Sequence, residues 1–446
     1  MPASYDSAVA RMYALGHELA HTPSHKFDLK LMRVLLAALD HPERRFPSVL
    51  IAGTNGKGST AATLASILQA SGLRTALYTS PHLVRINERI QINGRPIDDE
   101  KFALLHDLVE RTAERLIEDG ELPWHPSFFE MLTAMAFEHF ATSKIEIAVL
   151  EVGMGGRLDA TNVVEPRISV ITDISLDHQK FLGNTITEIA REKAGIIRPN
   201  GVVVTLPQSP EANDVIGNAI LEMNARAVNA AAHVPPVTPA SPSYLGPMVA
   251  RYPLSVMGGE IVVETPLLGR HQLRNVALAI AAAEELANQG YPLTPDSIER
   301  GIRETRWPGR FQVVPGTPEF VFDVAHNPAG AWALRSTLSA CCEDRRLIFV
   351  FGAMRDKAIQ EIAEILFPLA ERVIATRAEN PRSAGPEEIR SAASRTHADI
   401  ALAPDVASAI AQARVVAGES GVIVVTGSIY IVGEAMQVLG VRPDGE

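Results

Sequence analysis

VLIAGTNGKGST, residues 49–60, is the stretch that decides the fold of this 446-residue chain. Its first four residues are apolar and predict a buried strand, and the apolar and alanine-rich residues 61–68 after it predict a helix. A glycine-rich loop between a strand and a helix points successive backbone N–H groups at one anion, and the helix N-terminus adds a positive dipole end. The stretch therefore predicts a phosphate-binding loop. The alternative is a glycine-rich turn that binds nothing.

The residues of this loop have separate expected roles. We expect a nucleotide to be bound by the five consecutive residues Asn55, Gly56, Lys57, Gly58 and Ser59. Lys57 supplies a mobile cation that would stabilise a transferring phosphoryl group, and Ser59 supplies a hydroxyl for magnesium. The spacing departs from the common G-x-x-x-x-G-K-[ST] pattern, because only two residues separate Gly53 from Gly56 and because Gly58 stands between Lys57 and Ser59.

The composition is that of an ordinary globular protein, with 46% hydrophobic and 21% charged residues. The length predicts about two or three domains. No stretch is long and apolar enough for a membrane span, and the N-terminus lacks a signal segment. A net charge of −11 disfavours nucleic acid as a partner, and two adjacent cysteines, Cys341 and Cys342, do not suit a structural disulfide. We therefore expect a cytoplasmic, monomeric protein that acts on small molecules.

Apolar strands alternate with helices along the rest of the chain, which predicts an α/β fold with two doubly wound, mostly parallel sheets. The stretch 307–310, WPGR, interrupts the alternation, so we place a domain boundary there and expect domains of residues 1–306 and 307–446. Ligands of such sheets gather at the carboxyl ends of strands, which predicts a cleft between the domains. The predicted strands are residues 75–79, 145–150, 168–172, 202–205, 320–324, 347–351, 373–375 and 422–426.

Candidate metal ligands follow the predicted strands. Glu151 ends a buried strand, where a carboxylate is unfavourable unless a cation lies opposite it. With Ser59 and Ser80 it would complete an oxygen shell for magnesium on nucleotide phosphates. The alternative is a strand-end acid that caps a backbone turn. His178 is a candidate ligand of a second ion, although imidazole is a less usual partner of magnesium than oxygen, and the alternative is a structural histidine.

Other candidates lie on helices and near the domain boundary. Lys193, from sequence alone, would be a solvated lysine on a helix that opens with the capping box at 185–188. Asn275 is placed to bond a purine edge or a ribose, or it is only a helix-start asparagine. Arg310 would reach nucleotide phosphate across the cleft, or would form a salt bridge near the boundary. Asp323 and His326 follow a strand, where Asp323 would accept from ribose hydroxyls and His326 would face the cleft.

Together these motifs resemble the folylpolyglutamate synthase and dihydrofolate synthase family of the ATP-dependent Mur ligase superfamily. The resemblance implies a P-loop ATPase-like (Mur ligase central) domain over residues 1–306 and a Rossmann-like glutamate ligase domain over 307–446. It runs in order from about residue 28 to Gly433. The segments that carry it are 53–59, 79–83, 151–162, 191–195, Arg310 and 323–328.

The resemblance also implies site roles. It implies that ATP is bound by Asn55 to Ser59, Asn275, Arg310 and Asp323, and that two magnesium ions are held by Ser59, Ser80, Glu151 and His178. It implies that Lys193 is carbamylated and that Lys57, Lys193 and His326 are the catalytic residues. The folate substrate would be bound by Asp28, Leu29, Phe129, Leu158, Asp159, Ala160 and Ser428.

The expected reaction joins L-glutamate to a folate precursor. ATP would phosphorylate a carboxylate, the amine of L-glutamate would attack the acyl phosphate, and an amide, ADP and phosphate would result. Whether the acceptor is dihydropteroate, tetrahydrofolate or both is left open. One rival is a cell-wall UDP-sugar–amino acid ligase, which needs a UDP-binding domain before the phosphate loop, whereas 52 residues precede Gly53 here. Another is a nucleotide-driven switch protein, which would not need a second α/β domain.

Overall fold

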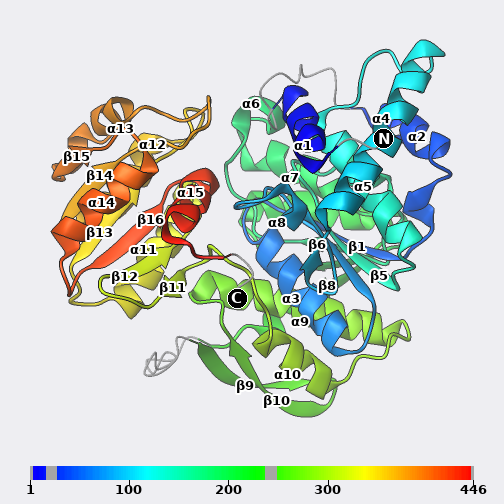
Figure 1. Ribbon diagram of the computed structural model, residues 1–446. Coiled ribbons are helices and arrows are strands. Elements are labelled where there is room, and N and C mark those ends of the chain that lie inside the picture. The colour runs from blue at the N-terminus through cyan, green and yellow to red at the C-terminus, as the bar shows by residue number, and fades with distance from the viewer. Residues whose placement is uncertain (1–3, 17–27, 237–248, 443–446) are drawn as a thin grey trace.

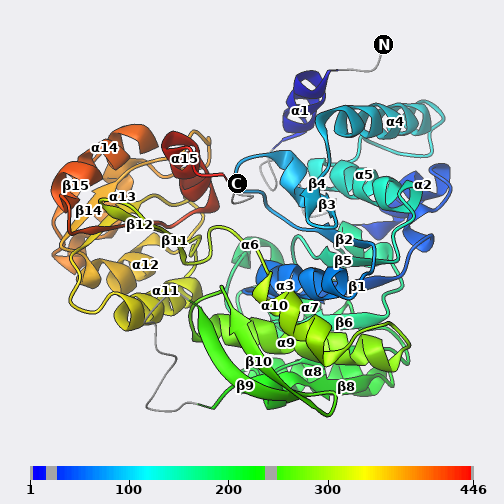
Figure 2. The same cartoon turned by 60° about the horizontal axis from the view of Figure 1, so that its bottom comes forward.

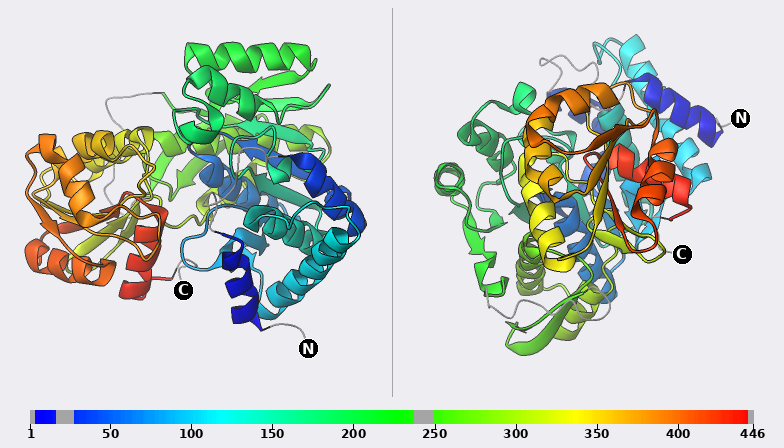
Figure 3. Two further views of the ribbon diagram at one scale, coloured as in Figure 1. Left: turned by 90° about the horizontal axis from the view of Figure 1, so that it is seen from above. Right: turned by 90° about the vertical axis from the view of Figure 1, so that its left-hand side faces the viewer.

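The computed structural model describes residues 4–16, 28–236 and 249–442, which form two α/β lobes (Figure 1). The N-terminal lobe holds an eight-stranded sheet, and the C-terminal lobe holds a six-stranded sheet. We keep 306/307 as the proposed boundary between them. The two lobes touch closely at α15 (Ile429–Leu439), the red helix that faces the N-terminal lobe in Figure 3. A Cβ atom at Gly433 would lie 2.0 Å from the backbone oxygen of Leu83.

The larger sheet has the strand order β4-β3-β2-β5-β1-β6-β7-β8. The pairs from β2 to β8 are parallel, whereas β3 and β4 form an antiparallel edge. The strands are β1 Ser48–Ala52, β2 Thr75–Tyr78, β3 Ile90–Ile92, β4 Arg95–Pro96, β5 Ile147–Glu151, β6 Ile168–Ile171, β7 Val202–Thr205 and β8 Arg226–Asn229.

Helices cover both faces of this sheet, because side chains of the central strand alternate between two hydrophobic cores. Leu50 belongs to the core beneath α4 and α5, and Ile51 belongs to the core beneath α3, α9 and α10 (Figure 2). None of the helices within the described residues has the length and apolar character of a membrane span. The helices of this lobe are α1 Tyr5–Ala14, α2 Leu29–Ala38, α3 Lys57–Ala70, α4 Asp99–Glu118, α5 Phe128–Thr142, α6 Gln179–Leu182, α7 Ile186–Ala194, α8 Pro210–Glu222, α9 Arg270–Asn288 and α10 Pro295–Arg303.

The smaller sheet has the order β11-β12-β16-β13-β14-β15, in which only β11 is antiparallel to its neighbour. Two cores again lie on its two faces. Its strands are β11 Gln312–Val314, β12 Glu319–Phe322, β13 Leu347–Phe351, β14 Arg372–Ala375, β15 Ile400–Leu402 and β16 Val422–Thr426. Its other helices are α11 Pro328–Cys341, α12 Ile359–Leu366, α13 Pro386–Ala392 and α14 Val406–Ala417.

The predicted fold class is confirmed, since both sheets are doubly wound and mostly parallel. All nine predicted strands, including the one at residues 49–52, are present, with ends shifted by two residues at most. Helix α4, the edge strands β8, β11 and β15, and the hairpin of β9 (Ala250–Val256) and β10 (Gly259–Thr265) were not predicted from the sequence. Short 3-10 helices occur at Pro42–Arg44, Ile86–Arg89, Ala160–Val163, Ala230–His233, Phe367–Leu369 and Ser394–Thr396.

Candidate active site

The phosphate loop joins β1 to α3, which begins at Lys57. Its backbone passes so close to its neighbours that only glycine fits at two positions. A Cβ atom at Gly53 (φ +152°) would lie 1.8 Å from the Thr172 hydroxyl, and one at Gly56 (φ +88°) would lie 2.1 Å from Asn275 Oδ1. The left-handed conformation at Gly56 also favours glycine. The loop is thereby held against β6 and α9, and the first three residues of α3 line a cavity.

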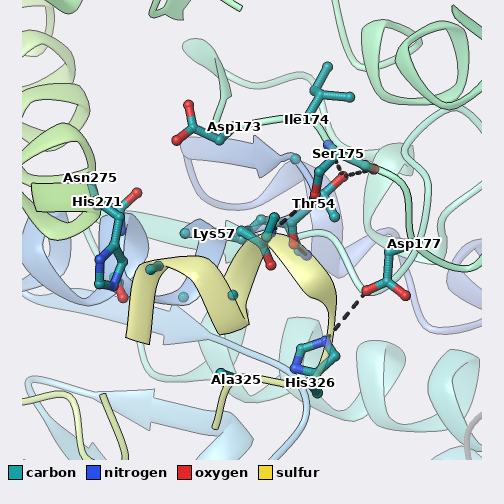
Figure 4. A pocket seen from close by; sticks show the side chains of 18 of the residues that line it. Thr54, Lys57, Asp173, Ile174, Ser175, Asp177, His271, Asn275, Ala325 and His326 are labelled. Atoms are coloured by element: carbon teal, nitrogen blue, oxygen red, sulfur yellow. Dashed lines mark hydrogen bonds and ion pairs between the residues drawn. The ribbon is translucent and has the colours of Figure 1, made fainter. Parts of the chain in front are cut away.

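This first cavity has a volume of about 480 Å³ and lies between the two lobes. The N-terminal lobe contributes the phosphate loop and the start of α9, and the C-terminal lobe contributes the segment after β12. Figure 4 shows Asn275 and His271 at the left of the view, Lys57 near its centre and His326 below. All the residues expected to bind the nucleotide line this cavity: Asn55, Gly56, Lys57, Gly58, Ser59, Asn275, Arg310 and Asp323.

A second cavity, of about 530 Å³, has a more apolar wall formed partly by Met32 and Phe128. Ser80, Arg310 and His326 line both cavities, so the two cavities meet where the lobes face each other. All seven residues expected to bind the folate substrate line the second cavity: Asp28, Leu29, Phe129, Leu158, Asp159, Ala160 and Ser428.

The four expected metal ligands also line the first cavity. Glu151 Oε2 accepts a hydrogen bond from the backbone N–H of Ser80 at 3.1 Å. Burial raises the pKa of Glu151, and the positive charge of Lys57 opposes that rise. Two hydroxyls and a carboxylate are the hard oxygen donors that suit magnesium. No three His, Cys, Asp or Glu side chains among the described residues form a ready-made metal cluster, so phosphate and water oxygens would have to complete the shell.

His178 lies at the start of α6 with a left-handed backbone (φ +51°). Burial lowers its pKa to about 3, although the neighbouring Asp177 opposes this. The ring is therefore neutral at pH 7, and a neutral imidazole nitrogen is the form that binds metals.

Lys193 is not a solvated lysine, and that sequence-based expectation is wrong. Lys193 lies on the buried face of α7 and is 3% exposed. Its Nζ donates a hydrogen bond to the backbone oxygen of Gly53 at 2.7 Å. Burial lowers its pKa to about 7, and Lys57 contributes to the shift. The physical reason is a close approach, since a Cβ atom at Gly156 would lie 2.6 Å from the backbone oxygen of Glu192. Glycine at 156 therefore lets α7 pack against the segment that follows β5, which covers the part of the helix that carries Lys193.

Arg310 and Asp323 lie on the C-terminal side of the first cavity. Burial lowers the pKa of Arg310, and the negative charges of Asp323 and Glu151 oppose that shift. Asp323 accepts backbone hydrogen bonds from Phe311 and Ala325, each at 2.9 Å. Burial raises its pKa despite these donors. Asp323 therefore also shapes the backbone that presents Arg310.

Three residues for which the sequence predicted no role meet at the junction of the lobes: Asp177, Asn327 and Lys357. Asp177 contacts Lys357 Nζ at 2.5 Å, Asn327 Nδ2 at 3.2 Å and His326 Nε2 at 3.4 Å (Figure 4 shows the His326 contact). The available signal was the position of Asp177 beside His178 at a strand end. Lys357, 180 residues away, carried no signal.

The two lobes match two family models. Residues 129–283 match the Mur ligase middle domain, and residues 309–429 match the Mur ligase, glutamate ligase domain. A dihydrofolate synthase/folylpolyglutamate synthase of Bacillus subtilis is 34% identical over 416 residues, covering 90% of this chain and 93% of the relative. The chain belongs to the dihydrofolate synthase/folylpolyglutamate synthase family. The resemblance seen in the sequence motifs is thereby confirmed.

Solved structures of the same family share its fold. A Mycobacterium tuberculosis folylpolyglutamate synthase complexed with ADP and AMPPCP superposes with a TM-score of 0.87 at 33% identity, covering 98% of this chain and all of that chain (100%). An Escherichia coli FolC in complex with DHPP and ADP superposes with a TM-score of 0.83 at 29% identity, covering 99% of this chain and 98% of that chain. As a member of this family, the chain is an ATP-dependent ligase that forms an amide bond.

Proposed function

We propose that this chain adds L-glutamate to dihydropteroate, to a reduced folate, or to both, through an acyl phosphate. The observation that carries the proposal is the junction of the two cavities at Ser80, Arg310 and His326. One cavity has a phosphate loop and the other has an apolar and aromatic wall. A phosphoryl group at the end of a nucleotide and a carboxylate at the end of a flat aromatic substrate would meet there.

In the proposed reaction, the γ-phosphoryl group passes to the acceptor carboxylate. Lys57 and Arg310 stabilise the charge on the transferring group. The amine of L-glutamate then attacks the acyl carbon, the C–O bond to phosphate breaks, and the amide and phosphate are released. Magnesium, where bound by Ser59, Ser80 and Glu151, would neutralise phosphate charge. Closure of the two lobes would exclude water, which otherwise hydrolyses the acyl phosphate.

We further propose a carbamate on Lys193 and a second ion near His178. A carbamate forms when a neutral amine attacks carbon dioxide and a proton is released, and burial favours the neutral amine here. Lys57 lowers the pKa of Lys193 through its positive charge, and the same charge would favour an anion at this position. The carbamate oxygens would then bond to a metal-bound water or orient His178.

The acceptor proposal draws support from Asp159. Its Oδ1 accepts from the backbone N–H and the hydroxyl of Thr161 at 3.0 Å and 2.5 Å, and its Oδ2 accepts from the Met154 N–H at 2.9 Å. A carboxylate oxygen has two lone pairs, so Oδ2 keeps one for a ring N–H of the substrate. We also propose that the chain acts as a monomer in the cytoplasm.

The test of the proposed function is ADP release with each acceptor, with and without L-glutamate. We expect release that depends on both L-glutamate and either dihydropteroate or tetrahydrofolate. The ratio of the two rates would define the acceptor. ADP release that is independent of glutamate and of both acceptors would favour the nucleotide-driven switch and reject the ligase proposal.

A further inference from the structure

One carboxylate of the N-terminal lobe holds three side chains of the C-terminal lobe. The carboxylate of Asp177 contacts the ammonium of Lys357, the amide of Asn327 and the imidazole of His326. The side chains of Asp177 and Lys357 are only 8% and 9% exposed. When this buried carboxylate pairs with the cation of the other lobe, the contact fixes the position of one lobe relative to the other.

On its own side, Asp177 belongs to a loop that is fastened to the phosphate loop. The backbone oxygen of Asp173 accepts from the N–H groups of Thr54 and Asn55, at 2.9 Å and 3.2 Å. The Thr54 hydroxyl donates to the Ser175 oxygen at 3.0 Å and accepts from the Ser175 N–H at 3.1 Å. The position of the carboxylate is therefore tied to the nucleotide-binding segment.

On the other side, the three partners belong to the ends of two strands of the smaller sheet. His326 and Asn327 follow β12, and Lys357 follows β13. His326 Nδ1 donates to the Val324 oxygen at 2.9 Å, which turns Nε2 toward Asp177. Asn327 also donates to the phosphate-loop residue Asn55 at 3.0 Å. His326 and Lys357 both line the second cavity. The contacts with Asp177 therefore determine where these two side chains lie in the wall that would face the acceptor.

The charge balance favours a contact that can open. The ammonium of Lys357 lies 2.5 Å from Asp177 Oδ1, and both side chains are buried, so the two residues form a buried ion pair. Desolvation of a buried ion pair roughly offsets its Coulombic attraction, so separating the lobes and rehydrating both ions is not prohibitive. An apolar contact of the same size would lose stabilisation on every opening.

We propose that Asp177 is a positioning residue that latches the C-terminal lobe to the phosphate loop and so places His326 and Lys357 at the junction of the two cavities. This inference rests on the proposed function, because the latch is useful only where groups from both lobes must meet. The latch acts through His326 and Lys357 and need not touch the substrate itself. Replacing either Asp177 or Lys357 should therefore lower kcat for the same reason, and replacing both should cause no further loss.

The test is a double-mutant cycle with Asp177→Asn, Lys357→Met and the double variant. We expect each single variant to lower kcat for glutamate-dependent ADP release about 100-fold, because each leaves the other buried charge uncompensated. The double variant should be no slower than the worse single one. Affinity for ADP, measured without turnover, should stay within about threefold in all three.

A matched control is Glu285→Gln. Glu285 is also a buried carboxylate that pairs with a cation, Arg226, but both lie in the N-terminal lobe and neither lines the first or the second cavity. We expect this variant to lower the melting temperature and to leave kcat unchanged. If Asp177→Asn behaves in the same way, Asp177 is only structural and the latch is overturned.

If the fold-loss of kcat in the double variant equals the product of the two single losses, Asp177 and Lys357 act separately, and this result would also overturn the latch. Lys357→Met keeps the proposal falsifiable if Asp177→Asn does not fold, since an unchanged kcat in that variant rejects the latch. Different results would reject the proposed function and the proposed latch. A wild-type chain without glutamate-dependent turnover overturns both the function and the latch, whereas an active wild type with unaffected variants overturns the latch alone.

Discussion

Lys193 Nζ lies 2.7 Å from the backbone oxygen of Gly53, so a lysine of α7 contacts the first glycine of the phosphate loop although 140 residues separate them. This contact places the lysine beside the expected metal and phosphate positions. A bare ammonium there would repel magnesium, whereas a carbamate would act as a carboxylate. The chemistry of this position is therefore the first thing to test.

Lys193→Ala should lower kcat about 100-fold, the effect of losing a group that orients a metal ligand. Formate or acetate should restore part of the activity, because a small carboxylate can occupy the space of the carbamate. The matched control is Arg191→Ala, which removes an exposed cation from the same helix and should leave kcat unchanged. A fully active Lys193→Ala variant without any additive would rule out the carbamate.

Lys193 should also make stability depend on pH in carbon dioxide-free buffer. Its folded-state pKa is lowered to about 7, so between about pH 7 and about pH 10 the unfolded chain binds more protons than the folded one. The free energy of unfolding contributed by this residue therefore rises with pH across that window. Lys193→Met has no titrating group at this position, so we expect it to be more stable than the wild type at pH 7. This difference in the free energy of unfolding should shrink as the pH rises. Chemical denaturation at several pH values measures this, and a pH-independent difference would contradict the lowered pKa.

Lys57→Ala and Glu151→Ala should each lower ADP release by at least about 1,000-fold, because each removes charge that acts on the transferring phosphoryl group. Neither should unfold the chain. Glu151 is a buried carboxylate whose pKa is raised, so its removal relieves desolvation when no ion is bound. Circular dichroism and ADP release on the same samples check both statements. ADP release at the wild-type rate in either variant would reject the phosphate-loop and metal proposals.

Asp323 and His326 should affect different steps. Asp323→Ala should raise the KM for ATP by about tenfold. It should also lower the melting temperature, because it leaves the buried N–H groups of Phe311 and Ala325 unpaired at about 1–3 kcal/mol each. His326→Ala should instead slow amide formation, measured in a single turnover with preformed complex. Full-rate glutamate ligation by residues 1–306 alone would contradict a site built from both lobes.

The sequence predicted much of the fold because its signals are local. The phosphate loop, the capping box at 185–188 and the apolar strands are each set by neighbouring residues, and each appears as expected. Helix α4, which was not predicted, also has local signals in the sequence: the Asp98 cap and apolar residues at helical spacing. The burial of Lys193 could not be predicted, because it depends on how closely α7 packs against the segment around Gly156, which follows β5. The Asp177–Lys357 contact likewise arises only when the two lobes meet.

The most direct test of the account is the fate of oxygen from the acceptor carboxylate. The acceptor is prepared with ¹⁸O in that carboxylate and is turned over with ATP and L-glutamate, and the phosphate released is analysed by mass spectrometry. An acyl phosphate formed where the two cavities meet predicts one ¹⁸O atom in each phosphate, because the carboxylate oxygen that receives the phosphoryl group leaves with it. Unlabelled phosphate, released alongside the amide product, would contradict the central claim.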